Sequence, residues 1–353
     1  MSDYQDFRLA VEALSGGRNT VLLDDAGLPS VVVYLPQMMS CELAGGLPRH
    51  VHPGFIAGGK EYPRVCISKY PNIIREGRAY SLPLQHPEGC VTYDDAIQAS
   101  RRKGPGWGLI PASLWSAVAL WCRKNGTEPR GNNARGSACL YPEEQGVVTG
   151  RENDLPAVTA AGSGPLSWYH DRTAAGLADL VGNVSEWNAG MRLCRGEIQI
   201  LPNADSVLPG ADLSESSDQW RAILPDGNLC HPGCRDTLKL DMENGRWKIS
   251  TSLSDAVDDA RGSLFRDMTY DAEMLPGGVP DILKELSVYP AEEDRSSYAE
   301  DLVFANNAQA ERICLRGGNW SSGLHSGVFY YAMDARRNRC LPRLDFRSVC
   351  YER

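Results

Sequence analysis

The sequence lacks the features that identify membrane-spanning, secreted and zinc-binding chains. No segment approaches 18 uninterrupted apolar residues, and Asp3, Asp6, Arg8 and Glu12 stand where a signal peptide needs an apolar core. The 11 cysteines include no CxxC pair, which argues against a zinc ribbon and against a secreted disulfide framework. We therefore expect no membrane insertion, no signal peptide and mostly reduced thiols.

An excess of positive charge is also absent. The 353 residues include 36 Lys and Arg against 45 Asp and Glu, and the formal net charge is −9. A polyanion such as nucleic acid would be repelled by the molecule as a whole, so no nucleic-acid partner is expected. The charge is unevenly spread: residues 254–301 hold 13 acidic against 4 basic side chains and are predicted to form an exposed insertion, whereas residues 312–353 include eight arginines.

Long amphipathic stretches are few, while 35 glycines and 22 prolines are spread along the chain, which predicts many loops and short strands. The expected regular elements are a helix over residues 3–14, strands over 20–23, 30–35 and 65–69, and helices over 94–103 and 113–124. The Gly- and Asn-rich run at 131–136 is too polar and too turn-prone for regular structure.

The motifs of common enzymes and metal sites are missing. His170 and Asp171 resemble half of a hydrolytic triad, but no Gly-x-Ser-x-Gly elbow accompanies them. Cys230 and Cys234 lie four residues apart without the further ligands that a four-coordinate site needs. Neither pair therefore indicates a reaction.

Three stretches occur in a fixed order: 176–187 (GLADLVGNVSEW), 315–320 (LRGGNW) and 345–347 (DFR). With upstream segments such as 52–56 (HPGFI) and 130–133 (RGNN), they resemble the C-type lectin-like fold used by formylglycine-generating enzymes and by the variable proteins of diversity-generating retroelements, especially the phage-associated ones. The resemblance implies an α+β fold with two helices, a twisted antiparallel sheet and long loops or insertions.

The resemblance also implies a division of the chain. Residues 1–48, an N-terminal helix with strands, are a candidate region for attachment or oligomerisation. Residues 49–353 are expected to form the lectin-like domain, with the acidic insertion at 254–301 and a variable region at 319–347.

Whether the chain is an enzyme depends on cysteines. Formylglycine-generating enzymes carry a catalytic pair of thiols five residues apart just before the Ala-Arg that reads here as residues 335–336, and such a pair binds copper and activates oxygen. Val328 and Met333 occupy those two positions, and the nearest thiols are Cys314 and Cys340. We therefore expect no enzyme activity, with a formylglycine-generating type of oxidoreductase as the alternative.

The 176–187 stretch is a candidate calcium site. Asp179 and Glu186 supply carboxylates, and the carbonyl groups of Gly182 and Val184 lie between them in sequence, an oxygen-rich set suited to a hard cation. Formylglycine-generating enzymes use a matching stretch for calcium. No other cofactor is expected.

In the variable proteins, the segment corresponding to 319–347 is the diversified region. Its scaffold is expected to consist of turn glycines and buried residues, with Arg347 holding the last strand by hydrogen bonds: Gly317, Gly318, Gly323, Gly327, Trp320, Val328, Phe329 and Phe346. Tyrosine, arginine, serine and histidine between them are typical of binding surfaces. The candidate ligand-binding residues are Ser321, Ser322, Leu324, His325, Tyr330, Tyr331, Ala332, Asp334, Ala335, Arg337, Arg339, Cys340, Leu341 and Arg343.

The sequence thus predicts a ligand- or receptor-binding variable protein, acting as a phage or prophage adhesin toward a protein or glycan on a host cell. A virion tail partner or further copies of the chain are the other expected partners. The expected location is the phage tail, or the host cytoplasm before assembly. A structural virion protein without a binding role is a further alternative.

Overall fold

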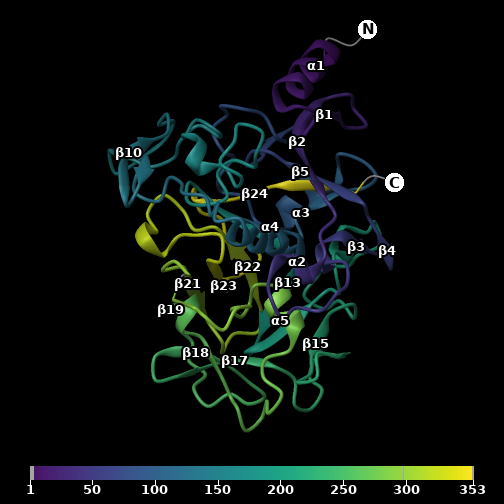
Figure 1. Ribbon diagram of the computed structural model, residues 1–353, viewed down its shortest axis with the longest axis vertical. Coiled ribbons are helices and arrows are strands. Elements are labelled where there is room, and N and C mark those ends of the chain that lie inside the picture. Colours follow the sequence, from purple (N-terminus) through teal and green to yellow (C-terminus); the bar gives the residue numbers. More distant parts are fainter. Residues whose placement is uncertain (1–3, 297, 352–353) are drawn as a thin grey trace.

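The computed structural model describes residues 4–296 and 298–351 and has an α+β fold (Figure 1). Its α-helices within these residues are α1 (Tyr4–Ser15), α2 (Ser40–Leu43), α3 (Tyr93–Arg101), α4 (Ala112–Lys124) and α5 (Asp281–Glu285). The three longer helices begin and end within two residues of the predicted bounds. The two helices expected in the middle of the first half, α3 and α4, lie near the centre of the molecule in Figure 1.

The first sheet joins the two ends of the chain. Its strand order is β1 (Asn19–Leu23), β2 (Pro29–Pro36), β5 (Arg64–Ser68), β25 (Ser348–Cys350) and β8 (Trp107–Leu109), and all neighbours are antiparallel. The strands predicted at 20–23, 30–35 and 65–69 are confirmed. Because β2 pairs with β5 over five residues and β5 pairs with β25, the predicted division after residue 48 is wrong: residues 19–36 belong to the same sheet as the C-terminal strand.

The second sheet is larger and mostly antiparallel. Its main path runs β19 (Arg261–Leu264), β21 (Leu302–Ala305), β23 (Tyr331–Ala335), β22 (Arg312–Arg316), β13 (Ser185–Cys194), β14 (Glu197–Ile200), β17 (Lys239–Glu243), β18 (Arg246–Ser250) and β20 (Thr269–Tyr270). Off this path, β15 (Arg221–Ile223) pairs with β14 and β16 (Leu229–Cys230), and β24 (Leu344–Phe346) pairs with β13. The β13–β24, β18–β20 and β21–β23 pairs are parallel.

The loops contain short two-stranded sheets. These pair β3 (Ile56–Ala57) with β4 (Lys60–Glu61), β6 (Ile73–Arg75) with β7 (Arg78–Tyr80), β9 (Ser137–Ala138) with β10 (Tyr141–Gln145), and β11 (Arg151–Glu152) with β12 (Leu155–Pro156). The run at 131–136 has no regular structure, as predicted. Loops and short strands therefore connect the large sheets, in keeping with the many glycines and prolines.

Local sequence explains where α3 and α4 lie. The Thr92 side chain accepts a hydrogen bond from the Asp95 amide (3.2 Å), so it caps α3, and Asp94 and Asp95 in the first turn favour that end of the helix dipole. α4 is buried along most of its length. Within it, the Trp115 indole donates to the Val328 carbonyl (3.0 Å), which connects the helix to the C-terminal segment.

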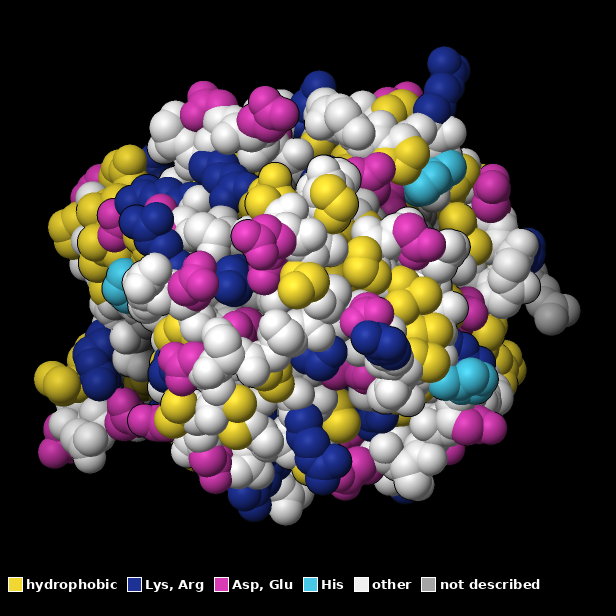
Figure 2. All heavy atoms as spheres, turned by 90° about the horizontal axis from the view of Figure 1, so that it is seen from below, with side chains coloured by type: hydrophobic (Ala, Val, Ile, Leu, Met, Phe, Trp, Pro, Cys, Tyr) yellow, Lys and Arg dark blue, Asp and Glu magenta, His cyan; other side chains and the backbone are white. Residues whose placement is uncertain are grey.

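The predicted exposed acidic insertion packs into the body of the protein. Buried side chains such as Phe265, Leu283 and Val288 from residues 254–301 belong to the main hydrophobic core. These apolar residues alternate with the acidic ones, and burying them offsets the cost of ordering the segment. Seen from below, acidic and basic side chains lie interspersed on the surface (Figure 2). Among the described residues, no helix is both long enough and apolar enough to cross a bilayer.

Candidate ligand-binding face

The scaffold of the C-terminal segment is as predicted. Trp320, Val328, Phe329 and Phe346 are buried, and two successive glycines with positive φ follow β22. A Cβ on Gly317 would lie 2.4 Å from the Leu180 carbonyl oxygen, so this position accepts no larger residue without a shift of the backbone. The segment is therefore held to the 176–187 stretch by close backbone packing.

Arg347 has the structural role expected of it. Its guanidinium is completely buried and donates to both carboxylate oxygens of Glu186, at 2.6 and 2.5 Å. It also donates to the carbonyl oxygens of Ser68 and Ala178, both at 3.1 Å. One side chain thereby connects β5, the 176–187 stretch and β13 to the C-terminal strands.

This ion pair involves Glu186, one of the residues of the predicted calcium site. Both of its oxygens accept from Arg347, and the Asp179 carboxylate accepts from the Gly162 amide at 2.6 Å. Burial raises the pKa of Asp179 to about 6. Glu186 is therefore held in a buried ion pair with Arg347, and calcium at Asp179, Gly182, Val184 and Glu186 stays a prediction.

Three of the predicted ligand-binding residues are wrong. Tyr331, Ala332 and Ala335 are buried in β23, which lies between β21 and β22 in the large sheet. The Tyr331 hydroxyl donates to the Val288 carbonyl oxygen (3.0 Å), so its polar end is used inside the protein. Residues packed above and below the sheet cover both faces of this strand, and only Asp334 reaches the surface from it.

The other predicted residues reach solvent. Ser321, Leu324, His325 and Cys340 are exposed, and the rest are half-buried. We name this set the candidate face: Ser321, Ser322, Leu324, His325, Tyr330, Asp334, Arg337, Arg339, Cys340, Leu341 and Arg343. Ser185 connects the start and the end of this segment. Its hydroxyl accepts a hydrogen bond from the Asn319 side chain (3.4 Å), and its amide donates to the Arg343 carbonyl oxygen (2.8 Å).

Two arginines of the candidate face already have acidic partners. Arg337 donates to both carboxylate oxygens of Glu311 (2.8 and 2.9 Å) and to Asp94 (2.9 Å). Arg339 pairs with Asp334 at 2.6 Å. These pairs hold the loop after β23 against α3 and against β23 itself, so the cationic character expected from the sequence is partly neutralised.

A cavity of about 540 Å³ adjoins the candidate face. Leu324 contributes to its wall together with Leu140 and Tyr141, and all three side chains are exposed. The Arg130 guanidinium lies 3.4 Å above the centre of the Tyr141 ring. Exposed apolar and aromatic side chains beside a cationic group are typical of binding sites. This site was not predicted from the sequence, where the apolar pair 140–141, shortly after the irregular run at 131–136, is its only local signal.

Asp301 is a buried carboxyl group in the wall of this cavity. Its Oδ2 atom accepts from the Phe329 amide (2.8 Å), while Oδ1 has no donor at hydrogen-bonding geometry within the described part of the chain. Burial raises the pKa of Asp301 to about 7. Gly327 allows this approach, since a Cβ there would lie 2.0 Å from Oδ1.

The cavity contains no thiol pair at the positions expected for an oxidase. Val328 lines it and Met333 is buried in β23. Cys314 is also buried, and that burial raises its pKa. Cys340 is exposed on the loop that follows β23. The residues that the sequence aligns with the catalytic thiols are therefore apolar packing residues.

Cys340 has a different thiol partner. Its thiol donates to the Cys90 carbonyl oxygen (2.9 Å), and both cysteines are exposed. Partial burial and a hydrogen bond to the Cys90 thiol raise the pKa of Cys340.

We predict that diamide, which is reduced to its hydrazine, oxidises the thiols of Cys90 and Cys340 to one disulfide. Peptide mapping is expected to find the Cys90–Cys340 cross-link with the loss of two hydrogen atoms. Its absence from oxidised wild-type protein, measured against a Cys340→Ser control, contradicts the prediction.

The comparisons with known proteins give matches in structure alone. No model of a protein family matches the chain, and no curated protein matches it. Solved structures that match include Treponema denticola variable protein 1, with 11% identity over 95% of this chain and 99% of that one and a TM-score of 0.37. PvdO from Pseudomonas aeruginosa matches with 14% identity over 94% and 98% of the two chains and a TM-score of 0.35.

A third match is the P3c variant of the Major Tropism Determinant, which is 9% identical in sequence. The match covers 94% of this chain and 71% of that chain, with a TM-score of 0.32. By name, two of these structures are a variable protein and a tropism determinant. At such identities and TM-scores, the likeness says nothing about ligand or activity. The site described above rests on the residues of this chain.

Proposed function

We propose that this protein is a ligand-binding variable protein, not an enzyme, and that the candidate face with its adjoining cavity recognises a protein or glycan on a host cell. One observation carries the proposal. Within residues 319–347, the scaffold side chains are buried while the polar, cationic and aromatic side chains between them reach solvent beside a cavity. Exchange of the solvent-facing residues changes the surface and leaves the core intact.

We infer that the N-terminal helix attaches the protein to a phage tail or to further copies of the chain. α1 stands at the end of the molecule in Figure 1, and Phe7 and Val11 pack against a small hydrophobic cluster below it. Leu9 and Leu14 point outward, with 57% and 89% of their surfaces exposed. Exposed leucines on a helix at one end are suited to contact with a tail protein or a second copy of the chain, and several copies on a phage tail would strengthen weak individual contacts.

The test compares two surface variants of the full chain. The face variant carries Ser321→Ala, Leu324→Ala and His325→Ala, and the control carries Val257→Ala and Met274→Ala, exposed residues of the 254–301 segment. Fluorescently labelled proteins are incubated with whole cells of a panel of bacterial strains. On any strain that binds wild type, we expect the face variant to lose at least about tenfold in affinity. Truncating a single dominant contact residue costs about 2 kcal/mol or more, and about 1.4 kcal/mol is a tenfold change in affinity.

The control variant is expected to bind as wild type does, and both variants are expected to keep the wild-type Tm. Equal binding by the face variant and wild type on such a strain contradicts the proposed face and favours a structural virion role. A reverse-transcriptase gene beside a near-copy of the 3′ coding segment, differing at template adenines, is the genomic observation expected for a diversified protein.

A further inference from the structure

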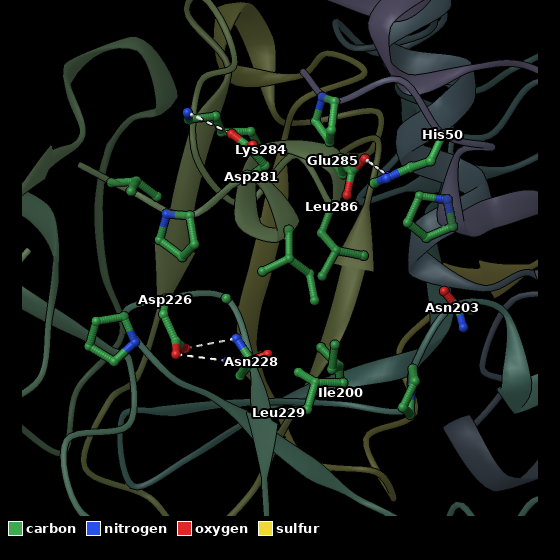
Figure 3. A pocket seen from close by; sticks show the side chains of 18 of the residues that line it. His50, Ile200, Asn203, Asp226, Asn228, Leu229, Asp281, Lys284, Glu285 and Leu286 are labelled. Atoms are coloured by element: carbon green, nitrogen blue, oxygen red, sulfur yellow. Dashed lines mark hydrogen bonds and ion pairs between the residues drawn. The ribbon is translucent and has the colours of Figure 1, made fainter. Parts of the chain in front are cut away.

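A second cavity lies outside the candidate face. It measures about 850 Å³ and is lined by parts of residues 48–56, 200–203, 225–229 and 277–286 (Figure 3). None of residues 319–347 contributes to its wall. Cavities of this size are typical of small-molecule and peptide sites. The cavity is therefore separate from the candidate face.

A buried carboxylate is held in place at the wall of this cavity. The Glu285 side chain is 4% exposed, and its Oε1 atom accepts from His50 Nε2 (2.6 Å) and from the Ser40 hydroxyl. The Glu285 carbonyl oxygen is contacted by His52 Nε2 (3.0 Å) and by the Ser116 hydroxyl (2.5 Å). Side chain and backbone are both anchored, so the carboxylate keeps its position when a ligand enters.

The second carboxylate oxygen is free to accept a hydrogen bond. Within the described residues, Oε2 of Glu285 has no hydrogen-bond partner, and in Figure 3 it points away from the oxygen that meets His50, toward the inside of the cavity. Burial lowers the pKa of the neighbouring His52 to about 4, so His52 brings no positive charge near neutral pH. A hydrogen-bond donor on a ligand would satisfy this oxygen.

The other charged groups of the cavity favour a cationic ligand. Asp226 accepts from the backbone and side chain of Asn228 (2.9 and 2.8 Å), and these hydrogen bonds lower the pKa of Asp226. Lys284 is paired with Asp281 at 3.1 Å. With Glu285, the wall carries three carboxyl groups against one lysine and His50. The field inside is therefore attractive to a positive charge.

Apolar side chains cover much of the remaining wall. Ile200, Leu229 and Leu286 are labelled around the open space in Figure 3, and Val279 and Ile282 also line it. Proline residues at 53, 202, 225 and 280 restrict the backbone of the surrounding loops. A ligand that fits such a wall has an aliphatic body as well as its charge.

We propose that this cavity is a binding site for an organic ammonium ion, which donates a hydrogen bond to Oε2 of Glu285 and packs its aliphatic chain against Ile200, Leu229 and Leu286. A free aliphatic amine and the lysine side chain of a peptide share this chemistry. The site is assembled from four segments that are far apart in the sequence, and it is independent of the candidate face.

The experiment titrates full-length protein with three probes by calorimetry: cadaverine, Nα-acetyl-lysine methylamide and, as the neutral comparison, 1-pentanol. At least one of the two amines is expected to bind at least tenfold more tightly than pentanol. Tighter binding of cadaverine indicates a free amine as the natural ligand, and tighter binding of the lysine derivative indicates a peptide. If neither amine binds better than pentanol, the proposal is overturned.

Two variants and one control localise the site. Glu285→Gln is expected to weaken amine binding at least tenfold, and Leu229→Trp is expected to do the same by filling the cavity. Glu273→Gln is the control, because Glu273 is an exposed acidic residue of the same 254–301 segment. Should Glu285→Gln not fold, Leu229→Trp decides. Wild-type affinity in a folded Glu285→Gln or Leu229→Trp variant overturns the site. The candidate-face variant is expected to bind amines normally, which separates this test from that of the proposed function.

Discussion

Replacing Arg347 with methionine is expected to lower the free energy of unfolding by about 3–5 kcal/mol. Arg347 is fully buried, and the substitution leaves the Glu186 carboxylate buried without its two donors. It also leaves the carbonyl oxygens of Ser68 and Ala178 with one donor fewer each. Urea unfolding followed by tryptophan fluorescence measures the change.

A matched control is Arg336→Met, which removes an exposed arginine next to the loop after β23. Surface changes of this kind usually stay within about 0.5 kcal/mol. The double variant Arg347→Met, Glu186→Gln is expected to recover part of the loss, because it no longer buries an unpaired carboxylate. A loss below about 1 kcal/mol in Arg347→Met would show that the ion pair does not hold the C-terminal strands.

Replacing Asp301 with asparagine is expected to stabilise the protein at neutral pH relative to wild type. The pKa of Asp301 is raised from 3.8 to about 7 by burial, so between pH 4 and 7 the folded protein keeps a proton that the unfolded chain has released. Wild type therefore loses stability as the pH rises through this window. The loss is fully present above pH 7 and corresponds to roughly 4 kcal/mol.

Asparagine is neutral at every pH and can still accept from the Phe329 amide, so the variant lacks this dependence. The difference in free energy of unfolding between variant and wild type should grow from pH 4 to pH 7 and then stay constant. Asp259→Asn, at an exposed position, is the control. A difference that does not change between pH 4 and 7 would falsify the raised pKa. Urea unfolding at several pH values is the measurement.

Local sequence patterns predicted those helices and strands that are stabilised by residues close to one another in the chain. Helix α3 follows from Thr92 and the acidic first turn, and β1 and β2 follow from runs of β-branched residues around a turn. The separation of scaffold from surface residues in 319–347 was correct for Trp320 and Phe329. These features depend on neighbours in the chain and could therefore be found without coordinates.

The errors concern pairings between distant segments. Tyr331 looked like a contact residue because tyrosine is common at binding surfaces, but β21 and β22 enclose its strand. The ion pair of Glu186 was not predicted, because its partner Arg347 stands 161 residues later in the chain. The 850 Å³ cavity was not predicted, since its carboxylate and its apolar walls come from four segments.

The sequence by itself determined the three longer helices, the strands β1, β2 and β5, the scaffold of the C-terminal segment and the lack of a catalytic thiol pair, because each depends on residue type and spacing along the chain. Only the tertiary structure decided which side chains of that segment reach solvent, which cation meets Glu186 and where cavities open. The physical reason is that burial, ion pairing and cavity shape are set by segments brought together in space, and their separation in sequence carries no local signal.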